Sequence, residues 1–269
     1  MGKFSEKKLY KRVRWAIVFI QAVCPASTGW MRVEELRKPF VVAHRGASAL
    51  EPENTISAVR KAIELGFDMI EVDIRLSKDG EVVLMHDSRV DRVTDGKGEV
   101  RSLGLEEIRR LKVKGREKVA LLRDIMEITR GKTALLLDIK DPDAALEALN
   151  LAKEKNMLEQ IVFNTSDLET LERIRELEPE ARLSYSPSIQ DNLVEIARRL
   201  NLFMASIRFD LITRKLIETM HKLGVRVTSW GTNDPSIIQK LIYMGVDGII
   251  IDDPQLIRNI HPMVGPSIT

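Results

Sequence analysis

The strongest constraint on the fold is a regular alternation of short apolar runs with amphipathic stretches from residue 39 onward. From the third apolar run, successive runs start about every 21–26 residues. Their continuous apolar character is typical of parallel strands buried on both faces. The predicted strands are 40–45, 69–75, 134–139, 160–164, 181–186, 203–208, 225–230 and 247–251. Eight strands, each followed by a helix, predict an α/β protein with a (β/α)8 TIM barrel.

The stretches between these runs have the spacing of helices with one buried face. The predicted helices are 54–65, 121–130, 143–155, 167–177, 190–200, 211–223, 234–244 and 254–261. Of the 269 residues, 44% are hydrophobic and only 5% aromatic, so Leu, Ile and Val must fill one large core. We therefore predict a single barrel domain over residues 32–269.

The long gap between the second and third predicted strands holds an additional strand-like run, 81–86. The preceding Asp79-Gly80 pair is typical of a tight hairpin turn. We therefore predict a hairpin and loop inserted between barrel strands two and three. Counting outward from a two-residue turn pairs Asp73 with His86, which places this histidine at the level of the strand-two carboxylates.

Residues 1–31 form a separate basic and apolar extension. Residues 1–14 carry a net charge of +5, and residues 15–31 carry none. The extension is either upstream sequence before a true start at Met31, a short membrane anchor, or a packed accessory helix. Membrane contact is therefore expected only through residues 1–30.

The remaining composition narrows the class of partner and the location. The whole-chain charge of +2 leaves −3 after the first 14 residues, which argues against a broad basic surface for nucleic acid. Cys24 is the single cysteine, so no intrachain disulfide can form. We predict a cytoplasmic protein, with membrane association through the N-terminus as the alternative.

In a TIM barrel, chemistry lies at the carboxyl ends of the strands. The first predicted strand ends at His44-Arg45, and Gly46 permits the turn that follows. The second carries Glu71 and Asp73, which share one side because side chains alternate along a strand. Two inward carboxylates need a positive partner, and Mg²⁺ or Ca²⁺ would satisfy them. The alternative is a solvated pair, or a pair bound to Arg or Lys.

The third predicted strand carries Asp138 and Lys140 on one face. Because strands two and three are neighbours, Asp138 can complete a cluster of three carboxylates, and Lys140 can face an anionic ligand. Trp230, at the end of strand seven, is a candidate for the wall of the substrate pocket, although a single Trp at this spacing is more often a core residue. We assign His221 and His261 structural roles, and we predict Asn54 and the pair 233–234 as helix-start residues.

The strand ends together indicate one kind of chemistry. A metal with an arginine and a lysine is typical of a phosphate site. Two histidines in the same place supply an acid and a base. The combination predicts metal-assisted cleavage of a phosphodiester.

The sequence resembles the glycerophosphodiester phosphodiesterase family, within the phosphatidylinositol-phospholipase-C-like phosphodiesterases. The resemblance is carried by "AHRGAS" and "PENT" (43–55), "EVDIRLSKDGEVVLMHD" (71–87), "LDIK" (137–140), "SWGTND" (229–234) and "GVDGIIIDDP" (245–254). It implies a (β/α)8 barrel that hydrolyses glycerophosphodiesters to glycerol 3-phosphate and an alcohol with Mg²⁺ or Ca²⁺, Mn²⁺ being a further option. The implied roles are catalytic for His44 and His86, phosphate contact for Arg45 and Lys140, and metal binding for Glu71, Asp73 and Asp138.

The chain departs from the family pattern at a few positions. Asp138 stands where the family usually has Glu, and Thr165-Ser166 and Gly231-Thr232 replace bulkier residues near the mouth. The metal, the leaving alcohol and the oligomeric state therefore stay open, and His44 is favoured as the base with His86 as the acid. The rival functions are a lysophospholipase D-like or sphingomyelinase D-like activity on lipid phosphodiesters, a more distant phospholipase C, and a phosphate-binding barrel without catalysis.

Overall fold

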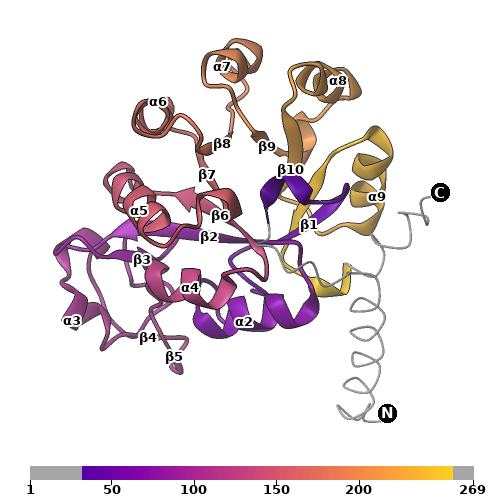
Figure 1. The fold of residues 1–269 in the computed structure, drawn as a ribbon. Coiled ribbons are helices and arrows are strands. Elements are labelled where there is room, and N and C mark those ends of the chain that lie inside the picture. Colours follow the sequence, from indigo (N-terminus) through magenta and orange to yellow (C-terminus); the bar gives the residue numbers. More distant parts are fainter. Residues whose placement is uncertain (1–31, 257–269) are drawn as a thin grey trace, which may run out of the picture.

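The computed structural model describes residues 32–256, and its centre is a closed barrel of parallel strands (Figure 1). Hydrogen bonds between β1 and both β2 and β11 close the sheet. The barrel strands are β1 (Phe40–Ala43), β2 (Met69–Leu76), β6 (Ala134–Ile139), β7 (Ile161–Thr165), β8 (Arg182–Tyr185), β9 (Met204–Arg208), β10 (Arg226–Trp230) and β11 (Gly248–Ile251). All eight match predicted strands, which confirms the (β/α)8 TIM barrel.

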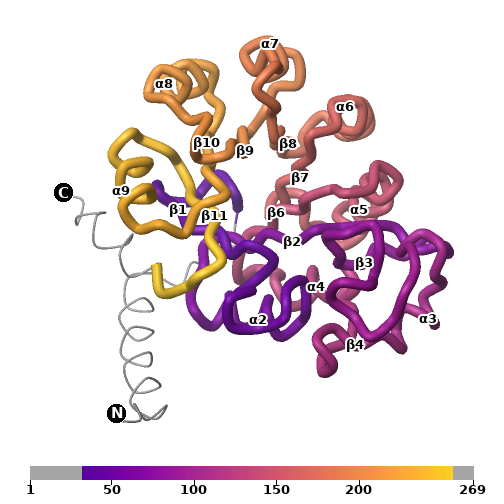
Figure 2. Tube along the Cα trace, turned by 180° about the vertical axis from the view of Figure 1, so that it is seen from behind, coloured from indigo at the N-terminus to yellow at the C-terminus, as the bar shows by residue number. Residues whose placement is uncertain are grey.

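The helices form a ring around the strands (Figure 2). They are α2 (Ile56–Leu65), α4 (Leu122–Thr129), α5 (Pro142–Glu154), α6 (Leu168–Leu177), α7 (Leu193–Arg199), α8 (Arg214–Lys222) and α9 (Pro235–Met244), each within a predicted helical range to one residue. Short 3₁₀ turns lie at 33–35, 100–102, 158–160, 209–211 and 254–256. The predicted helix 254–261 is described only over its first turn.

The barrel interior is divided along its axis. At the amino ends of the strands, inward side chains form an apolar cluster that includes Phe40, Met69, Leu136 and Met204. The outward side chains of the same strands pack against the helices in a separate, larger cluster. The buried inward carboxylates Glu71 and Asp73 lie beyond this layer, toward the carboxyl ends. The apolar layer fills the amino-terminal part of the barrel, so a polar site can form only at the carboxyl ends of the strands, as expected for this fold.

The hairpin between barrel strands two and three is present, with a register one residue different from the prediction. β3 (Val82–Leu84) pairs antiparallel with β2, and Ile74 lies opposite Leu84. The N–H of Met85, not that of His86, therefore donates to the Asp73 carbonyl at 3.0 Å. The reason is a three-residue loop, 78–80, in which Gly80 has the left-handed φ of 86°.

The rest of the insertion is a small packed unit. It contains α3 (Leu105–Ile108) and a two-stranded ribbon, β4 (Lys112–Val113) with β5 (Glu117–Lys118). Nine buried residues of residues 83–121 form their own apolar cluster beside the barrel. This core lets the insertion hold the side chains that follow β3 in place.

The predictions for residues 1–31, including a separate extension and a start at Met31, lie outside the described residues, as do Cys24 and His261. Within residues 32–256, no helix combines the length and apolar content needed to span a membrane. The domain boundary and the cytoplasmic location stay predictions.

Candidate active site

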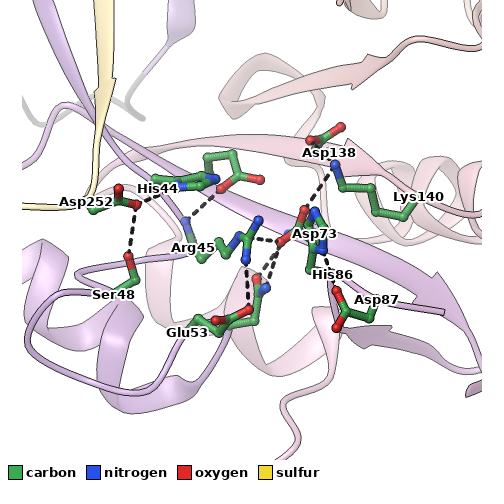
Figure 3. Close-up of polar contacts among 12 residues, drawn as sticks. His44, Arg45, Ser48, Glu53, Asp73, His86, Asp87, Asp138, Lys140 and Asp252 are labelled. Atoms are coloured by element: carbon green, nitrogen blue, oxygen red, sulfur yellow. Dashed lines mark hydrogen bonds and ion pairs between the residues drawn. The ribbon is translucent and has the colours of Figure 1, made fainter. Parts of the chain in front are cut away.

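A cavity of about 470 Å³ opens at the carboxyl ends of the barrel strands. Its wall brings together seven of the eight predicted site residues: His44, Arg45, Glu71, His86, Asp138, Lys140 and Trp230. The eighth, Asp73, is 1% exposed and lies against two of them, 3.2 Å from Arg45 Nε and 3.4 Å from Lys140 Nζ (Figure 3). Residues almost 190 positions apart thus meet in one cavity.

Glu71, Asp73 and Asp138 form a cluster whose ligand oxygens lie within 4.8 Å of one another. Glu71 Oε1 and Asp73 Oδ1 are buried and accept no hydrogen bond, although Lys140 Nζ lies 3.4 Å from Asp73 Oδ1. Burial and the neighbouring Asp73 carboxylate raise the pKa of Glu71 well above its ordinary value. Two unsatisfied buried carboxylate oxygens beside a third carboxylate fit a hard divalent cation.

Two cations partly neutralise this cluster. Lys140 Nζ lies 2.7 Å from Asp138 Oδ2 and also contacts Asp73. Arg45 contacts Asp73 through Nε and donates from Nη1 to Glu53 Oε1 at 2.9 Å. Burial works against the charge on Lys140, but the carboxylates of Asp138 and Asp73 raise its pKa. The lysine and the arginine at this end of the barrel are therefore both engaged with the carboxylate cluster.

The turn after β1 aims His44 and Arg45. Arg45 adopts a left-handed φ of 55°, and its N–H donates to Glu71 Oε2 at 2.7 Å. Gly46 follows with a φ of 76°, and a Cβ there would lie 2.8 Å from the backbone of Ala58. The predicted need for glycine at this turn is confirmed, because both conformation and space exclude a side chain.

Asn54 does not cap α2, contrary to the prediction. Thr55 is the N-cap and accepts from the N–H of Ala58. Asn54 has a left-handed φ of 58°, donates from Nδ2 to Asp73 Oδ2 at 2.8 Å, and accepts from the Asp73 N–H at 3.0 Å. This 4% exposed amide therefore holds a metal-ligand candidate instead of a helix end.

His44 is paired with Asp252, which follows the last barrel strand. The distance from His44 Nδ1 to Asp252 Oδ1 is 2.6 Å, and Asn233 Nδ2 donates to the other Asp252 oxygen at 2.7 Å. The hydrogen bond from His44 lowers the pKa of Asp252 to about 2, so this carboxylate is an acceptor and Nδ1 carries the proton. The other ring nitrogen, Nε2, is left for the cavity.

His86 has the same kind of partner from its own neighbour. His86 Nδ1 lies 2.7 Å from Asp87 Oδ1. The hydrogen bond from the Arg92 guanidinium, together with a smaller contribution from His86, lowers the pKa of Asp87 to about 2. Two histidines thus reach the same cavity, each with a carboxylate at Nδ1, an arrangement typical of general acids and bases.

The opposite wall of the cavity is uncharged. Asn164 donates to Asp138 Oδ1 at 3.1 Å and to Ser186 Oγ at 3.0 Å. Trp230 is 38% exposed and donates from Nε1 to the Ser206 carbonyl at 3.2 Å. Trp230 therefore lines the cavity instead of the core. Of the predicted helix-start pair, Asp234 caps α9, whereas Asn233 holds Asp252.

Several residues of this network were missed at the level of sequence. They are Glu53, Asp87, Arg92, Asn164, Asn233 and Asp252. The signal for Asp252 was present, because an acidic residue directly after the last barrel strand must lie at the mouth. The signal for Asp87 was its place beside His86.

Comparison with known proteins assigns the family. The sequence profile of the "Glycerophosphoryl diester phosphodiesterase family" matches residues 44–256. A "Glycerophosphodiester phosphodiesterase" of Caldanaerobacter subterraneus subsp. tengcongensis is 33% identical, over 83% of this chain and 98% of its own length. A solved phosphodiesterase of Oleispira antarctica, in complex with the product sn-glycerol-3-phosphate, is 26% identical with a TM-score of 0.76, covering 84% of this chain and 97% of its own. The glycerophosphodiester phosphodiesterase of Thermotoga maritima is 27% identical with a TM-score of 0.72, covering 81% and 96%. The chain belongs to the glycerophosphoryl diester phosphodiesterase family.

Proposed function

We propose that this protein is a metal-dependent phosphodiesterase that hydrolyses glycerophosphodiesters to sn-glycerol 3-phosphate and an alcohol. The observation that carries the proposal is one cavity that holds three clustered carboxylates and two histidines, each paired with an aspartate. Family membership and the glycerol 3-phosphate bound to the Oleispira antarctica relative support it.

Substrate binding would centre on the carboxylate cluster. Glu71, Asp73 and Asp138 are the residues that would hold Mg²⁺, Ca²⁺ or Mn²⁺. A bound divalent cation supplies charge neutralisation for the phosphate. Arg45 and Lys140 would bind the phosphate oxygens, since both line the cavity and both lie against the carboxylates. The uncharged wall, including Trp230, would contact the rest of the substrate.

Proton transfer would belong to the two histidines. One takes the proton of the nucleophile, which is either water or the 2-hydroxyl of the glycerol, and the other protonates the leaving alcohol. The sequence prediction makes His44 the base. Burial disfavours the charge on His44, but Asp252 and Glu71 raise its pKa. A raised pKa makes the imidazole a stronger proton acceptor, which is in keeping with this order.

A leaving-group experiment distinguishes these orders. A 4-nitrophenyl phosphodiester has a leaving group that needs no proton, whereas glycerophosphocholine does. The variant that lacks the acid should lose about 10²–10⁴-fold on glycerophosphocholine but much less on the nitrophenyl ester. The variant that lacks the base should lose activity on both. We expect His86→Ala to behave as the acid variant; equal losses for His44→Ala and His86→Ala on both substrates would contradict separate roles.

The function itself is tested by a turnover panel. Glycerophosphocholine and glycerophosphoethanolamine are compared with lysophospholipids, in the presence of Mg²⁺, Ca²⁺ or Mn²⁺ and after exhaustive chelation. We expect turnover of the water-soluble diesters that is lost on chelation and restored by a divalent ion. Full activity after chelation would exclude the metal role, and absence of turnover on every diester would favour a barrel without catalysis.

Lysophospholipase D-like activity is the second candidate because of the rim of the cavity. Leu50 after β1, Ile189 after β8 and Trp230 at the end of β10 expose 46%, 77% and 38% of their surface at the carboxyl ends of the strands. Exposed apolar residues on loops at the same end of the barrel suit an amphipathic substrate. Higher kcat/KM for lysophospholipids than for glycerophosphocholine in the same panel would establish this alternative.

A further inference from the structure

Arg92 stands between two carboxylates beside the cavity. It lies in the loop after β3 and donates to Asp87 through Nε at 2.5 Å and to Glu53 through Nη1 and Nη2 at 3.0 and 2.7 Å. Its guanidinium thus holds a residue of the insertion and a residue of the β1–α2 loop together. Arg92 is not among the residues that line the cavity, so any effect on the reaction must pass through its partners.

Both partners of Arg92 lead directly to predicted site residues. On one side, Asp87 binds His86 Nδ1 at 2.7 Å. On the other, Glu53 Oε1 accepts from Arg45 Nη1 at 2.9 Å, and Arg45 Nε lies 3.2 Å from Asp73 (Figure 3). One unbroken series of charge-assisted contacts therefore joins His86 to Arg45 through Arg92 and its two carboxylates. Arg45 in turn contacts Asp73, one of the three candidate metal ligands.

The chemistry of this position requires an arginine. A guanidinium presents five donors in a planar fork, enough to serve two carboxylates at once, whereas a lysine ammonium offers one compact centre. Glu53 and Asp87 would repel each other without a shared cation. The hydrogen bond from Arg92 is also the first cause of the lowered pKa of Asp87, so Asp87 stays ionised and accepts the proton-bearing Nδ1 of His86.

We propose that Arg92 is a positioning residue for the phosphodiesterase reaction, which orients His86 through Asp87 and Arg45 through Glu53. The inference rests on the proposed catalytic role of His86. It extends the active site beyond the barrel, since the insertion supplies the fixed cation that aligns two groups on the barrel mouth.

The test compares Arg92→Ala and Arg92→Lys with a matched control from the same loop, Arg89→Ala. Arg89 pairs with Asp91, is 53% exposed in its side chain, and touches no residue of the series. We expect Arg92→Ala to lower kcat on glycerophosphocholine roughly tenfold to 100-fold, because a small misplacement of catalytic groups has effects of this size. Arg92→Lys should recover part of the loss, and Arg89→Ala should stay near the wild-type value.

A structural readout separates positioning from general destabilisation. In ¹⁵N-histidine-labelled protein without metal, the Nδ1 proton of His86, held by Asp87, should give a low-field resonance. We expect Arg92→Ala to weaken or remove this resonance while thermal unfolding stays above the assay temperature. Arg89→Ala should leave the resonance in place.

Three outcomes would overturn the inference. They are an unchanged kcat in Arg92→Ala, an unchanged His86 resonance, or a loss of kcat that merely follows the fraction of unfolded protein in both Arg92 variants. Failure of the proposed function would look different. The wild-type protein would then turn over no glycerophosphodiester, yet the resonance would still show whether Arg92 orients His86.

Discussion

The two halves of the barrel mouth differ in charge although they belong to one continuous sheet. The half formed by β1, β2, β6 and β11 presents acids, bases and cations such as His44, Asp73 and Asp252. The half formed by β7 to β10 presents neutral groups such as Asn164 and Trp230. A buried charge that loses its partner is left uncompensated, whereas a lost neutral hydrogen bond costs only about 1 kcal/mol. The charged half should therefore control kcat, and the neutral half should mainly control substrate binding.

Asp73→Asn, in the charged half, should cause the largest loss of activity. Asp73 is 1% exposed and contacts Asn54, Arg45 and Lys140, so its removal leaves both cations without a shared partner. We expect activity to fall by about 10³-fold, the upper range for loss of one preorganised electrostatic group. Steady-state kinetics with saturating Mg²⁺ measures the loss, and isothermal titration with Mg²⁺ should show weaker metal binding.

Asp143→Asn is the control for this experiment. Asp143 also pairs with an arginine, Arg101, but its side chain is 62% exposed on α5 and does not line the cavity. Its loss should change neither activity nor metal binding, since exposed ion pairs contribute little. Wild-type metal affinity in Asp73→Asn would remove this residue from the metal site.

Asp252→Asn changes a residue after β11, where the charged half borders the neutral half, and should cause an intermediate loss of activity. The asparagine keeps the shape but not the charge that fixes the proton of His44 on Nδ1, and loss of such a partner typically costs about 10–100-fold in activity. Burial lowers the pKa of His44, but Asp252 and Glu71 raise it above its ordinary value against this effect and that of Arg45. Without the charge of Asp252, His44 should therefore titrate at lower pH. An NMR titration of the His44 ring measures the shift.

The His44–Asp252 pair also makes the stability of the folded protein depend on pH. A raised folded-state pKa stabilises the protein below the unfolded pKa of about 6.5, and the contribution is lost as the pH rises through the folded value. The variant should therefore be destabilised more at pH 5.5 than at pH 8.5, as thermal unfolding will show. Asp253→Asn removes a neighbouring charge that caps Gln255 and does not bond to His44. An equal shift of His44 in both variants would mean that the paired geometry is irrelevant.

The charged half was also the half most open to prediction from sequence. Strand alternation places Glu71 with Asp73, and Asp138 with Lys140, on one face whatever the rest of the chain does. The hairpin was misplaced by one residue because Asp79-Gly80 suits loops of two or three residues equally. The strand end places Asp252 at the mouth but does not name its partner, His44, which is 208 positions away and meets it only when the barrel closes. Arg92 escaped because one of its carboxylates, Glu53, lies 39 positions away on a different loop.

The neutral half was harder to predict for a different reason. Ser186 and Asn164 are ordinary residues at strand ends, and neither type implies a ligand until a cavity is seen beside it. Hydrophobic periodicity located every strand of this half, because burial on both faces leaves a strong pattern. The same periodicity carries no information on which uncharged side chain will contact a substrate.

Trp230→Ala, in the neutral half, should have the smallest effect on the kinetic constants. The ring is partly exposed at the mouth, and its one hydrogen bond is to the Ser206 carbonyl. We expect KM to rise about fivefold, in line with roughly 1 kcal/mol for one neutral contact, with kcat within about twofold of wild type. Tyr243→Ala, which removes an 81% exposed aromatic ring from α9, is the control and should change neither constant. A fall in kcat comparable to that of Asp73→Asn would show that the neutral wall takes part in the chemical step, and the separation of the mouth into a reactive half and a binding half would then fail.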